Sequence, residues 1–327
     1  MKLVFVHLGN SVSRALGANL ERFHRSTNHP GIQVIFDQQS YKLHSHLRTC
    51  DSFIYRRPKG VSEIFATLAA PYNFRDGFWT YTVERFLALS QWHNAHPLEQ
   101  LIHIESDILT LPTFPWSFFE GLDSLAWCGF SKRADVGAIF YSPSANQTTW
   151  FVDELLKFIS NDPNLTDMTA LSLIAEQFPS RIIKLPTNFH DDLASLVGLF
   201  DGAPHGMWLS GQDPRNHYGL VKRRVIIPDS LVRPDRCEYK FVKSQELWVT
   251  EMGNAMPLHN LHIHSKRLSL LGPYWKAALR REIWRERNNF FSVTFSISSF
   301  LNSVKLYGKR HRFFSRHTLR RLLRGIP

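Results

Sequence analysis

Two carboxylates separated by a single serine are the residues of this chain whose types and spacing most directly suggest chemistry. Glu105, Ser106 and Asp107 interrupt an otherwise apolar run, residues 101–112, of the kind that forms a buried strand. Side chains at positions i and i+2 of an extended chain point to the same side, so both carboxylates should converge at a strand end. Such a pair repels unless a divalent cation or a shared proton relieves it, and oxygen ligands suit Mg²⁺ or Mn²⁺. A strand-ending turn that merely carries two acidic residues is the alternative.

A second polar segment, residues 260–268, offers complementary ligands. Its sequence is NLHIHSKRL, and on a short extended stretch His262 and His264 share one face, with Lys266 two residues further along. Mn²⁺ accepts imidazole beside carboxylates, and a lysine next to the metal suggests a diphosphate whose remaining charge needs neutralising. Two polar histidines near a loop are the simpler interpretation. Together with the acidic pair, the segment predicts a metal site.

These two motifs resemble those of metal-dependent nucleotide-sugar glycosyltransferases of the GT-A fold. Such enzymes carry a D-x-D or E-x-D motif after a central strand, and many add a distal His with a nearby Lys. The resemblance implies that Asp107 ligates the metal and that Glu105 assists directly or through water. It also implies that His264 completes the shell, with His262 as the alternative, while Lys266 meets the diphosphate. The whole acidic motif, serine included, would bind the donor.

The order of the predicted elements agrees with that family. Residues 2–8 and 33–37 have the pattern of strands, and residues 15–23 between them have the spacing of a helix. Residues 75–90 are predicted to form a helix that precedes the metal-binding strand. The expected fold is α/β, with a GT-A-like, single Rossmann-like nucleotide-binding domain around a mixed central sheet, spanning residues 1–270.

Three residues outside the two motifs are further candidates for the site. Asp37 ends the second strand and could bind the base or ribose, although a strand-terminal aspartate is as often a turn residue. In the resemblance Arg75 reaches the donor; a solvated arginine at a helix start is the alternative. Thr166 or Asp167 is expected to cap a helix over residues 164–178. Because the family often places an acceptor-facing carboxylate there, Asp167 is the first candidate for general base.

Residues 188–192 and 200–219 are predicted to be loops, because glycine and proline interrupt every periodicity in the longer one. Long glycine-rich loops inside a catalytic domain commonly cover a ligand. The longer segment resembles donor-covering loops of bacterial transferases that act on surface polysaccharide. Asp191, Asp192 and Asp213 are the reserve candidates for the general base, and Asp213 could equally just start a turn.

Length and composition are compatible with such an enzyme. The 327 residues are 43% hydrophobic, which suffices for one large α/β domain and an appendage. Three widely separated cysteines form no disulfide or zinc pattern, so a reducing compartment is expected. The sequence has neither a signal-peptide pattern nor a stretch of the ~18 apolar residues that a membrane span needs. We therefore expect a cytoplasmic protein.

Positive charge is concentrated at the end of the chain. From residue 273 onward there are thirteen Lys or Arg and two Glu, a net charge of +11 that equals the surplus of the whole chain. Aromatic and aliphatic residues interleave with these cations, as in segments that lie on an anionic bilayer. Residues 271–327 are therefore predicted to form a basic, amphipathic helical extension that holds the protein at the inner face of the cell membrane. Nucleic acid is the rival partner, and a helical cap that shows its basic side to water is a third option.

The predicted reaction is transfer of a hexosyl or related sugar from a nucleoside-diphosphate sugar to a hydroxyl of a glycan or lipid-linked acceptor. Mn²⁺ or Mg²⁺ would stabilise the departing diphosphate. One alternative is a nucleic-acid-binding protein in which the carboxylates are structural. The other is a metal-dependent hydrolase that activates a water at His262 and His264.

Overall fold

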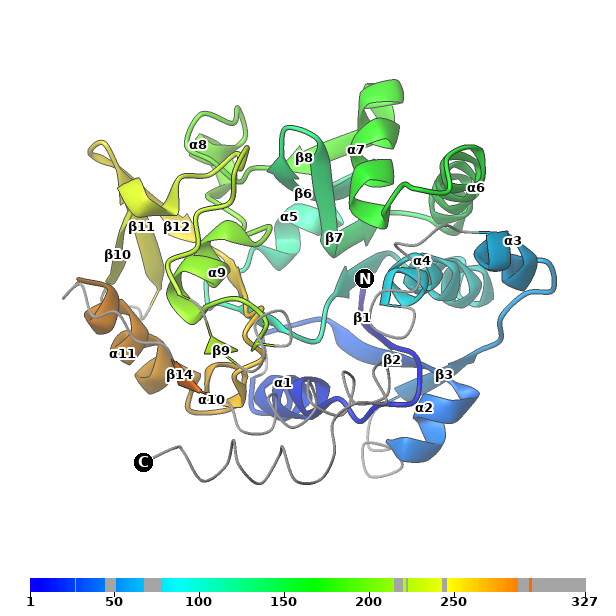
Figure 1. Ribbon diagram of the computed structural model, residues 1–327, viewed down its shortest axis with the longest axis horizontal. Coiled ribbons are helices and arrows are strands. Elements are labelled where there is room, and N and C mark those ends of the chain that lie inside the picture. The colour runs from blue at the N-terminus through cyan, green and yellow to red at the C-terminus, as the bar shows by residue number, and fades with distance from the viewer. Residues whose placement is uncertain are drawn as a thin grey trace, which may run out of the picture.

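A seven-stranded sheet forms the centre of the molecule. The structure, a computed structural model, describes residues 1–26, 28–44, 51–67, 78–214, 220–221, 223–242, 246–287 and 294–295. The strand order is β3-β2-β1-β4-β7-β6-β8 (Figure 1), and only β7 runs antiparallel to its neighbours. This confirms the predicted α/β fold with a mixed central sheet. In sheet order the strands are β3 Asp51–Tyr55, β2 Gly31–Asp37, β1 Lys2–His7, β4 Leu101–Ile104, β7 Ala134–Ser142, β6 Leu125–Ser131 and β8 Ile182–Leu185.

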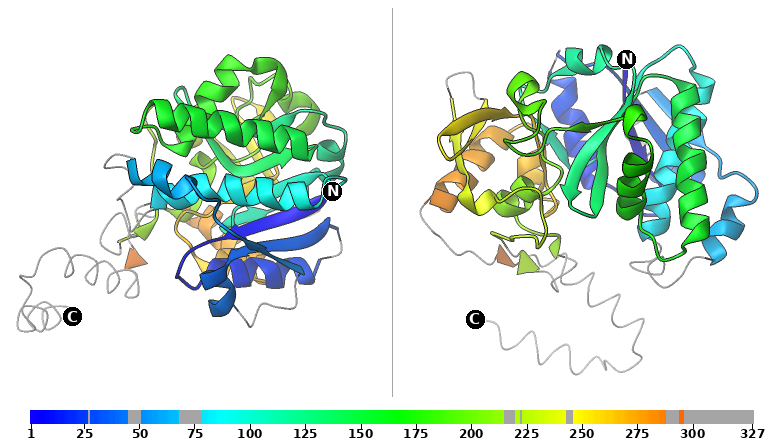
Figure 2. Two further views of the ribbon diagram at one scale, coloured as in Figure 1. Left: turned by 90° about the vertical axis from the view of Figure 1, so that its right-hand side faces the viewer. Right: turned by 90° about the horizontal axis from the view of Figure 1, so that it is seen from above.

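Helices cover both faces of this sheet. Along β1, Val4 packs into the apolar cluster on one face, whereas Leu3 and Phe5 pack into the cluster on the other. This alternation follows from the two-residue period of a strand and makes the sheet the middle of three layers (Figure 2). The first face is covered by α4 Phe78–Ala95, α6 Ala145–Asn161 and α7 Asp167–Gln177, and the second by α1 Arg14–His24 and α5 Trp116–Glu120.

Most elements expected from periodicity are present with small shifts in their bounds. The predicted strands at residues 2–8 and 33–37 correspond to β1 and β2, and the helix between them corresponds to α1. The predicted helices at 75–90 and 164–178 correspond to α4 and α7. Thr166 is the N-cap of α7, because its side chain accepts a hydrogen bond from the Thr169 amide, so Asp167 is the first helical residue.

A smaller region packs beside the large sheet (Figures 1 and 2). Its apolar cluster combines Leu109 and Leu261 with Trp275, Leu279 and Ile283 of the helix α11 Trp275–Arg287. The predicted domain boundary at 270/271 falls inside the short helix α10 Leu268–Leu271, and α11 shares the apolar cluster of the smaller region. The strands of the smaller region are β5 Ile108–Thr110, paired with β13 Asn260–His262, and the antiparallel sheet β10 Glu238–Phe241, β11 Leu247–Glu251 and β12 Asn254–Leu258. Its helices are α9 Pro204–Ser210, α10 Leu268–Leu271 and α11 Trp275–Arg287.

The expectation of a loop throughout residues 200–219 was wrong, because α9 occupies part of that segment. Pro204 starts this helix and Gly211, at φ 95°, ends it. A side chain at Gly206 would overlap the backbone carbonyl of His262, so glycine allows α9 to approach β13 closely. The residues that interrupt the periodicity are thus the ones that delimit and pack a short helix.

Short elements complete the described chain. None of the helices in this part is long and apolar enough to cross a membrane. The predicted basic extension is described only through α11 and at residues 294–295; its remaining residues lie outside the described part. The short elements are α2 Gln38–Leu43, α3 Val61–Thr67, α8 Ala194–Val197, the paired strands β9 Leu220–Val221 and β14 Thr294–Phe295, and the 3₁₀ helices Pro179–Arg181 and Pro234–Arg236.

Candidate metal centre

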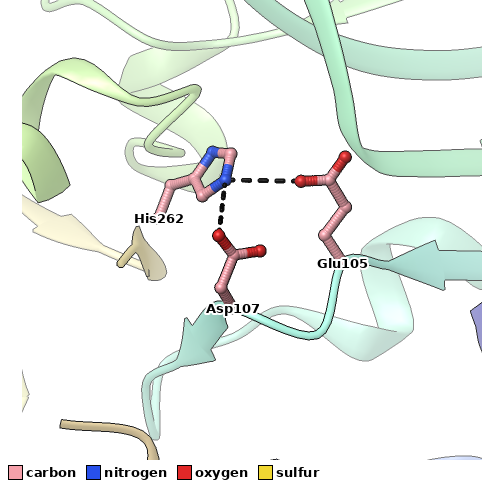
Figure 3. A group of neighbouring side chains, drawn as sticks. All are labelled: Glu105, Asp107 and His262. Carbon is pink, nitrogen blue, oxygen red and sulfur yellow. Dashed lines mark ion pairs between the residues drawn. The ribbon is translucent and has the colours of Figure 1, made fainter. Parts of the chain in front are cut away.

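The acidic motif forms a tight turn between β4 and β5. The amide of Ile108 donates to the carbonyl of Glu105 at 3.0 Å, and the Glu105 amide donates to Ala138 of β7 at 2.8 Å. The extended conformation expected for residues 105–107 was therefore wrong. The turn nevertheless directs the side chains of Glu105 and Asp107 toward one point (Figure 3). The predicted proximity of the carboxylates is present, although a different backbone conformation produces it.

Polar side chains of α1 hold this turn in place. Asn19 has no exposed surface, and its amide nitrogen donates to the carbonyls of Ser106 at 3.3 Å and Ile108 at 2.8 Å. Arg22 donates to the Thr110 carbonyl at 3.0 Å and to the Asn19 side-chain oxygen at 2.6 Å. Sequence reasoning missed both residues. The available signal was an asparagine within the apolar stripe of a helix, where a buried amide requires partners.

His262 reaches the carboxylates because β13 pairs with β5. In this antiparallel pair His262 lies opposite Ile108, and the Ile263 amide donates to the Asp107 carbonyl at 2.8 Å. The Nε2 atom of His262 is 3.3 Å from Glu105 Oε2 and 3.4 Å from Asp107 Oδ2 (Figure 3). One ligand atom from each residue lies within 4.8 Å of the other two, so the three could hold a metal ion.

The other ring nitrogen of His262 fixes its orientation. Nδ1 lies 3.1 Å from the carbonyl oxygen of Gly202. Because a carbonyl only accepts, Nδ1 carries a hydrogen, which leaves Nε2 as the ring atom that faces the two carboxylates and would ligate a metal. Metal-ligating histidines characteristically donate their second N–H to a carbonyl or carboxylate in this way. The His262 amide in turn donates to buried Asp201 at 2.9 Å, and burial raises the pKa of Asp201 to about 6.

Two internal cations pair with the acidic motif. Lys266 Nζ bonds Asp107, and Arg85 of α4 bonds Glu105. Burial alone would raise the pKa of Asp107, but Lys266 and His262 together hold that pKa well below its usual range. Lys266 was expected near a diphosphate, whereas Arg85 was missed because its helix is buried almost all round and gives no periodic signal.

The segment after His262 is not extended as expected. The strand ends at His262, and a turn closed by the Lys266 amide and the Ile263 carbonyl at 2.9 Å follows. Lys266 itself adopts the left-handed region at φ 52°, which is uncommon for a residue with a side chain. The turn returns the lysine to Asp107, so its position depends on backbone reversal rather than on strand alternation.

His264 lies next to the three candidate ligands and is not one of them. Its ring centroid is 3.9 Å from that of His262, at an interplanar angle of 31°. Burial, followed by the neighbouring His262, lowers the pKa of His264, and Asp213 is close enough to oppose this shift. The structure therefore brings His264 and Asp213 to the edge of the centre.

Asp167 approaches the centre through Arg85. Its carboxylate is 3.3 Å from Arg85 Nη2, on the guanidinium that also bonds Glu105. Asp167 is buried, and this desolvation raises its pKa while Arg85 opposes the rise. Its role as a general base stays a prediction.

The remaining candidates are not brought to the metal centre by any described contact. The Asp37 carboxylate caps α2 and also accepts the Gly9 amide at 2.7 Å, which ties the loop after β1 to the end of β2. Asp191 accepts from the amides of Thr187 at 2.7 Å and Asn188 at 3.0 Å, within its own loop. Arg75 lies outside the described residues.

Comparison with known proteins gives only distant likenesses. No family model and no curated protein matches the sequence. One solved structure is the glycosyltransferase GlyE of Streptococcus pneumoniae TIGR4, at 12% identity, covering 63% of this chain and 47% of that one, with a TM-score of 0.39. A second is the PaToxG glycosyltransferase, at 10% identity, covering 55% of this chain and 70% of that one, with a TM-score of 0.33. A third is a glycosyltransferase involved in the glycosylation of the major capsid of PBCV-1, at 9% identity, covering 56% of this chain and 80% of that one, with a TM-score of 0.34. The chain spans about half the length of GlyE. Likenesses this weak assign neither a family nor an activity, so the function has to be argued from the site.

Proposed function

We propose that this protein is a divalent-metal-dependent glycosyltransferase that uses a nucleoside-diphosphate sugar. The observation that carries the proposal is the meeting of Glu105, Asp107 and the Nε2 atom of His262 at one point. Each of the three offers one atom that can ligate a metal ion, and the three atoms are close enough to share one cation. Two carboxylates with one imidazole suit Mn²⁺ better than Mg²⁺, which prefers oxygen ligands throughout.

The position of this point in the sheet favours a nucleotide. The chain leaves β1 for β2 and β3 on one side and returns to β4 on the other side, so the strand order reverses between β1 and β4. In open α/β sheets, ligands bind outside the carboxyl ends of the strands at such a switch point. The loop at residues 8–13 and the turn at 105–107 both leave the sheet at these ends. We place the donor between them.

The charges around the centre suit a diphosphate. Bound by Glu105, Asp107 and His262, a divalent cation would offset the negative charge that develops on the departing diphosphate. Lys266, whose side chain is 41% exposed, can turn from Asp107 to a phosphate oxygen. Arg85 remains on Glu105 and keeps that ligand in place. Asp167 stays the proposed base for the acceptor, a glycan or lipid-linked hydroxyl.

A thermal-shift panel tests this proposal. The full chain is heated with UDP-, GDP-, CMP- and TDP-linked sugars, each with Mn²⁺ and with EDTA. One nucleotide should raise the melting temperature in Mn²⁺ and have no effect in EDTA, because its phosphates complete the metal's coordination. Sugar release is measured separately: release to water at the same rate with and without glycan acceptors would instead favour the metal-dependent hydrolase. No nucleotide effect under any condition would contradict the proposal.

We also propose that the basic segment beyond Phe295 contacts an anionic membrane surface. That segment contains eight of the thirteen cations counted from residue 273. Trp275, by contrast, packs into the protein core and cannot insert into lipid without unfolding α11, whereas Tyr274 is exposed. A truncated chain should therefore end at Phe295, which retains α11 and β14.

Vesicle flotation separates the three interpretations of this segment. The full chain should float with anionic vesicles at low salt and less at high salt, and the chain ending at Phe295 should not float. Binding to DNA that depends on the segment, without binding to vesicles, would favour nucleic acid. Equal flotation of both chains would contradict a role for the segment.

A further inference from the structure

A second charged cluster, distinct from the metal centre, lies where α11 packs against the segment before α10. Glu282 of α11 pairs with Arg223, with Arg267 at 2.9 Å and with Arg285 at 3.3 Å. We call these four residues the arginine cluster. The Glu282 side chain is 1% exposed and that of Arg223 is 8% exposed. A single buried carboxylate thus faces three guanidinium groups.

Neighbouring acidic residues do not neutralise the excess positive charge of the arginine cluster. The charges that act on Arg223 are Glu282, which attracts it, and Arg267 and Arg285, which repel it. Burial raises the pKa of Glu286, one turn further along α11, and the cation that opposes this rise most is Arg224 rather than an arginine of the cluster. The sequence contains no Asp or Glu at residues 214–228 or 287–327, so the segments next to the cluster along the chain add only cations. The cluster therefore retains about two positive charges.

Several donors in this cluster have no acceptor. The Nε and Nη2 atoms of Arg223 are buried without a hydrogen-bond partner in the described part of the chain, whereas Nη1 of Arg267 is held by its ion pair with Glu282. Burial lowers the pKa of Arg223, and the two neighbouring arginines add to that effect. A buried cation with unmet donors is costly, and an anion between the arginines would satisfy both the charge and the donors.

We propose that the arginine cluster binds a phosphate group, as a phosphate monoester or a diphosphate. Guanidinium groups match phosphate oxygens with two parallel hydrogen bonds, and a phosphate monoester carries about −1.5 to −2 charges near pH 7. The site is separate from the metal centre, because the Lys266 side chain extends to Asp107 whereas that of Arg267 extends to Glu282. Binding here needs no divalent cation and does not depend on glycosyl transfer.

The test is titration calorimetry of the full chain with inorganic pyrophosphate in EDTA at constant ionic strength. Wild-type protein should bind saturably, and Arg285→Gln should weaken binding about tenfold or more, because one charge-assisted contact is lost. Arg285 is partly exposed, and its removal leaves Glu282 paired with two arginines, so this variant should fold. Arg223→Gln should have a larger effect. Arg233→Gln is the matched control, since Arg233 forms an exposed pair with Asp235 elsewhere.

Three results would overturn the proposal. The first is the absence of saturable binding by wild-type protein. The second is an equal loss in Arg233→Gln, which would make binding a matter of net charge alone. The third is a loss in Lys266→Gln without a loss in Arg285→Gln, which would place pyrophosphate at the metal centre.

Flotation of the full chain and its Arg285→Gln variant with vesicles of stated composition identifies the source of the phosphate. A preference for phosphatidic acid over phosphatidylglycerol that Arg285→Gln removes would assign a lipid phosphate monoester. Retained pyrophosphate binding without that preference would assign a soluble phosphate compound.

Discussion

The metal centre and the arginine cluster are two solutions to the same problem, a buried carboxylate. They diverge at consecutive residues, since Lys266 extends to Asp107 and Arg267 extends to Glu282. At the metal centre, electron-pair donors converge and the internal cations lie at the periphery. In the arginine cluster, hydrogen-bond donors outnumber the one acceptor. The balance of charge in each cluster, more than the residue types, indicates which ligand it would accept.

The two clusters also differ in how they can exist without a ligand. Lys266 is partly exposed on a long side chain, so it can neutralise Asp107 at rest and withdraw when a metal enters. Among the described residues Arg223 pairs with no second carboxylate, and its buried side chain already shares Glu282. At the metal centre the protein's own lysine can neutralise the carboxylate, whereas the arginine cluster needs an external anion to balance its charge.

The largest expected effect tests whether Asp167, beside the metal centre, acts as a general base. Asp167→Asn should lower turnover by about 10²–10⁴-fold with nearly normal Mn²⁺ affinity, because proton transfer is lost while the shape of the side chain is kept. Steady-state kinetics and Mn²⁺ titration measure the two effects. A parallel fall in Mn²⁺ affinity would mean that Asp167 serves only to hold Arg85 on Glu105, and the contrast between a reactive and a purely electrostatic cluster would disappear.

Asp107→Asn should separate the two clusters most cleanly. Mn²⁺ affinity should fall by more than about 100-fold, since even residues that merely orient a ligand are worth 10–100-fold. Pyrophosphate binding in EDTA should not weaken. Calorimetry with each ligand measures both, and Asp153→Asn on the exposed surface of α6 is the control. If Asp107→Asn retained Mn²⁺ affinity, Asp107 would not be a ligand.

Replacing each histidine in turn sharpens the assignment within the metal centre. His262→Gln should weaken Mn²⁺ binding by about 10–100-fold, because Nε2 is the ring atom that faces both carboxylates. His264→Gln should have the smaller effect, since His264 lies beside the ligand group. The reverse order would restore the assignment of His264 that the sequence resemblance implies.

The last expected effect concerns the stability of the fold in acid rather than ligand affinity. Burial lowers the pKa of both His205 and His259 to about 4, so the unfolded chain, with pKa about 6.5, binds protons more readily. Their contribution to stability is present above pH 6.5 and is lost as the pH falls toward 4. Asp201 opposes this, because its raised pKa of about 6 favours the folded state as pH falls below 6.

Burial also lowers the pKa of His103, to about 3, so the histidine shifts together exceed the aspartate shift. The free energy of unfolding should therefore fall by several kcal/mol between pH 7 and 4.5. Urea unfolding at both values measures it, and His205→Gln should show a smaller difference. The arginine cluster carries guanidinium charges that do not titrate in this range. Equal stability at both pH values would show that these histidines are not buried neutral.

Local sequence patterns were enough to predict the helices and strands. The composition of the metal centre depends on pairing between segments that are far apart in the sequence. The periodicity around Leu16, Leu20 and Phe23 sufficed for α1, because one face of a helix must be apolar to be buried. The proximity of Glu105 and Asp107 could also be predicted locally, because only one residue separates them in the sequence. No pattern near His262 shows that it pairs with Ile108 or that its Nδ1 meets Gly202.

The residues that sequence reasoning missed share a physical reason. Arg85 lies in a helix segment buried on every side, so nothing marks which neighbour it bonds. The arginine cluster combines Arg223, Arg267 and Glu282 from three distant segments, and counting charge along the chain placed the whole surplus after residue 273. Charge in sequence and charge in space differ because folding brings together cations that a linear count keeps apart.

The pairing of β5 with β13 has a consequence for how the protein is made. Synthesis proceeds from the N-terminus, so Glu105, Asp107 and Arg85 leave the ribosome long before His262 and Lys266. Domains fold as their segments become available, and contacts between distant segments form late because closing a long loop costs entropy. The large sheet can begin to assemble while Asp107 still lacks both its histidine and its lysine. A nascent chain that stops before β13 therefore lacks His262 and Lys266, two residues of the proposed metal centre.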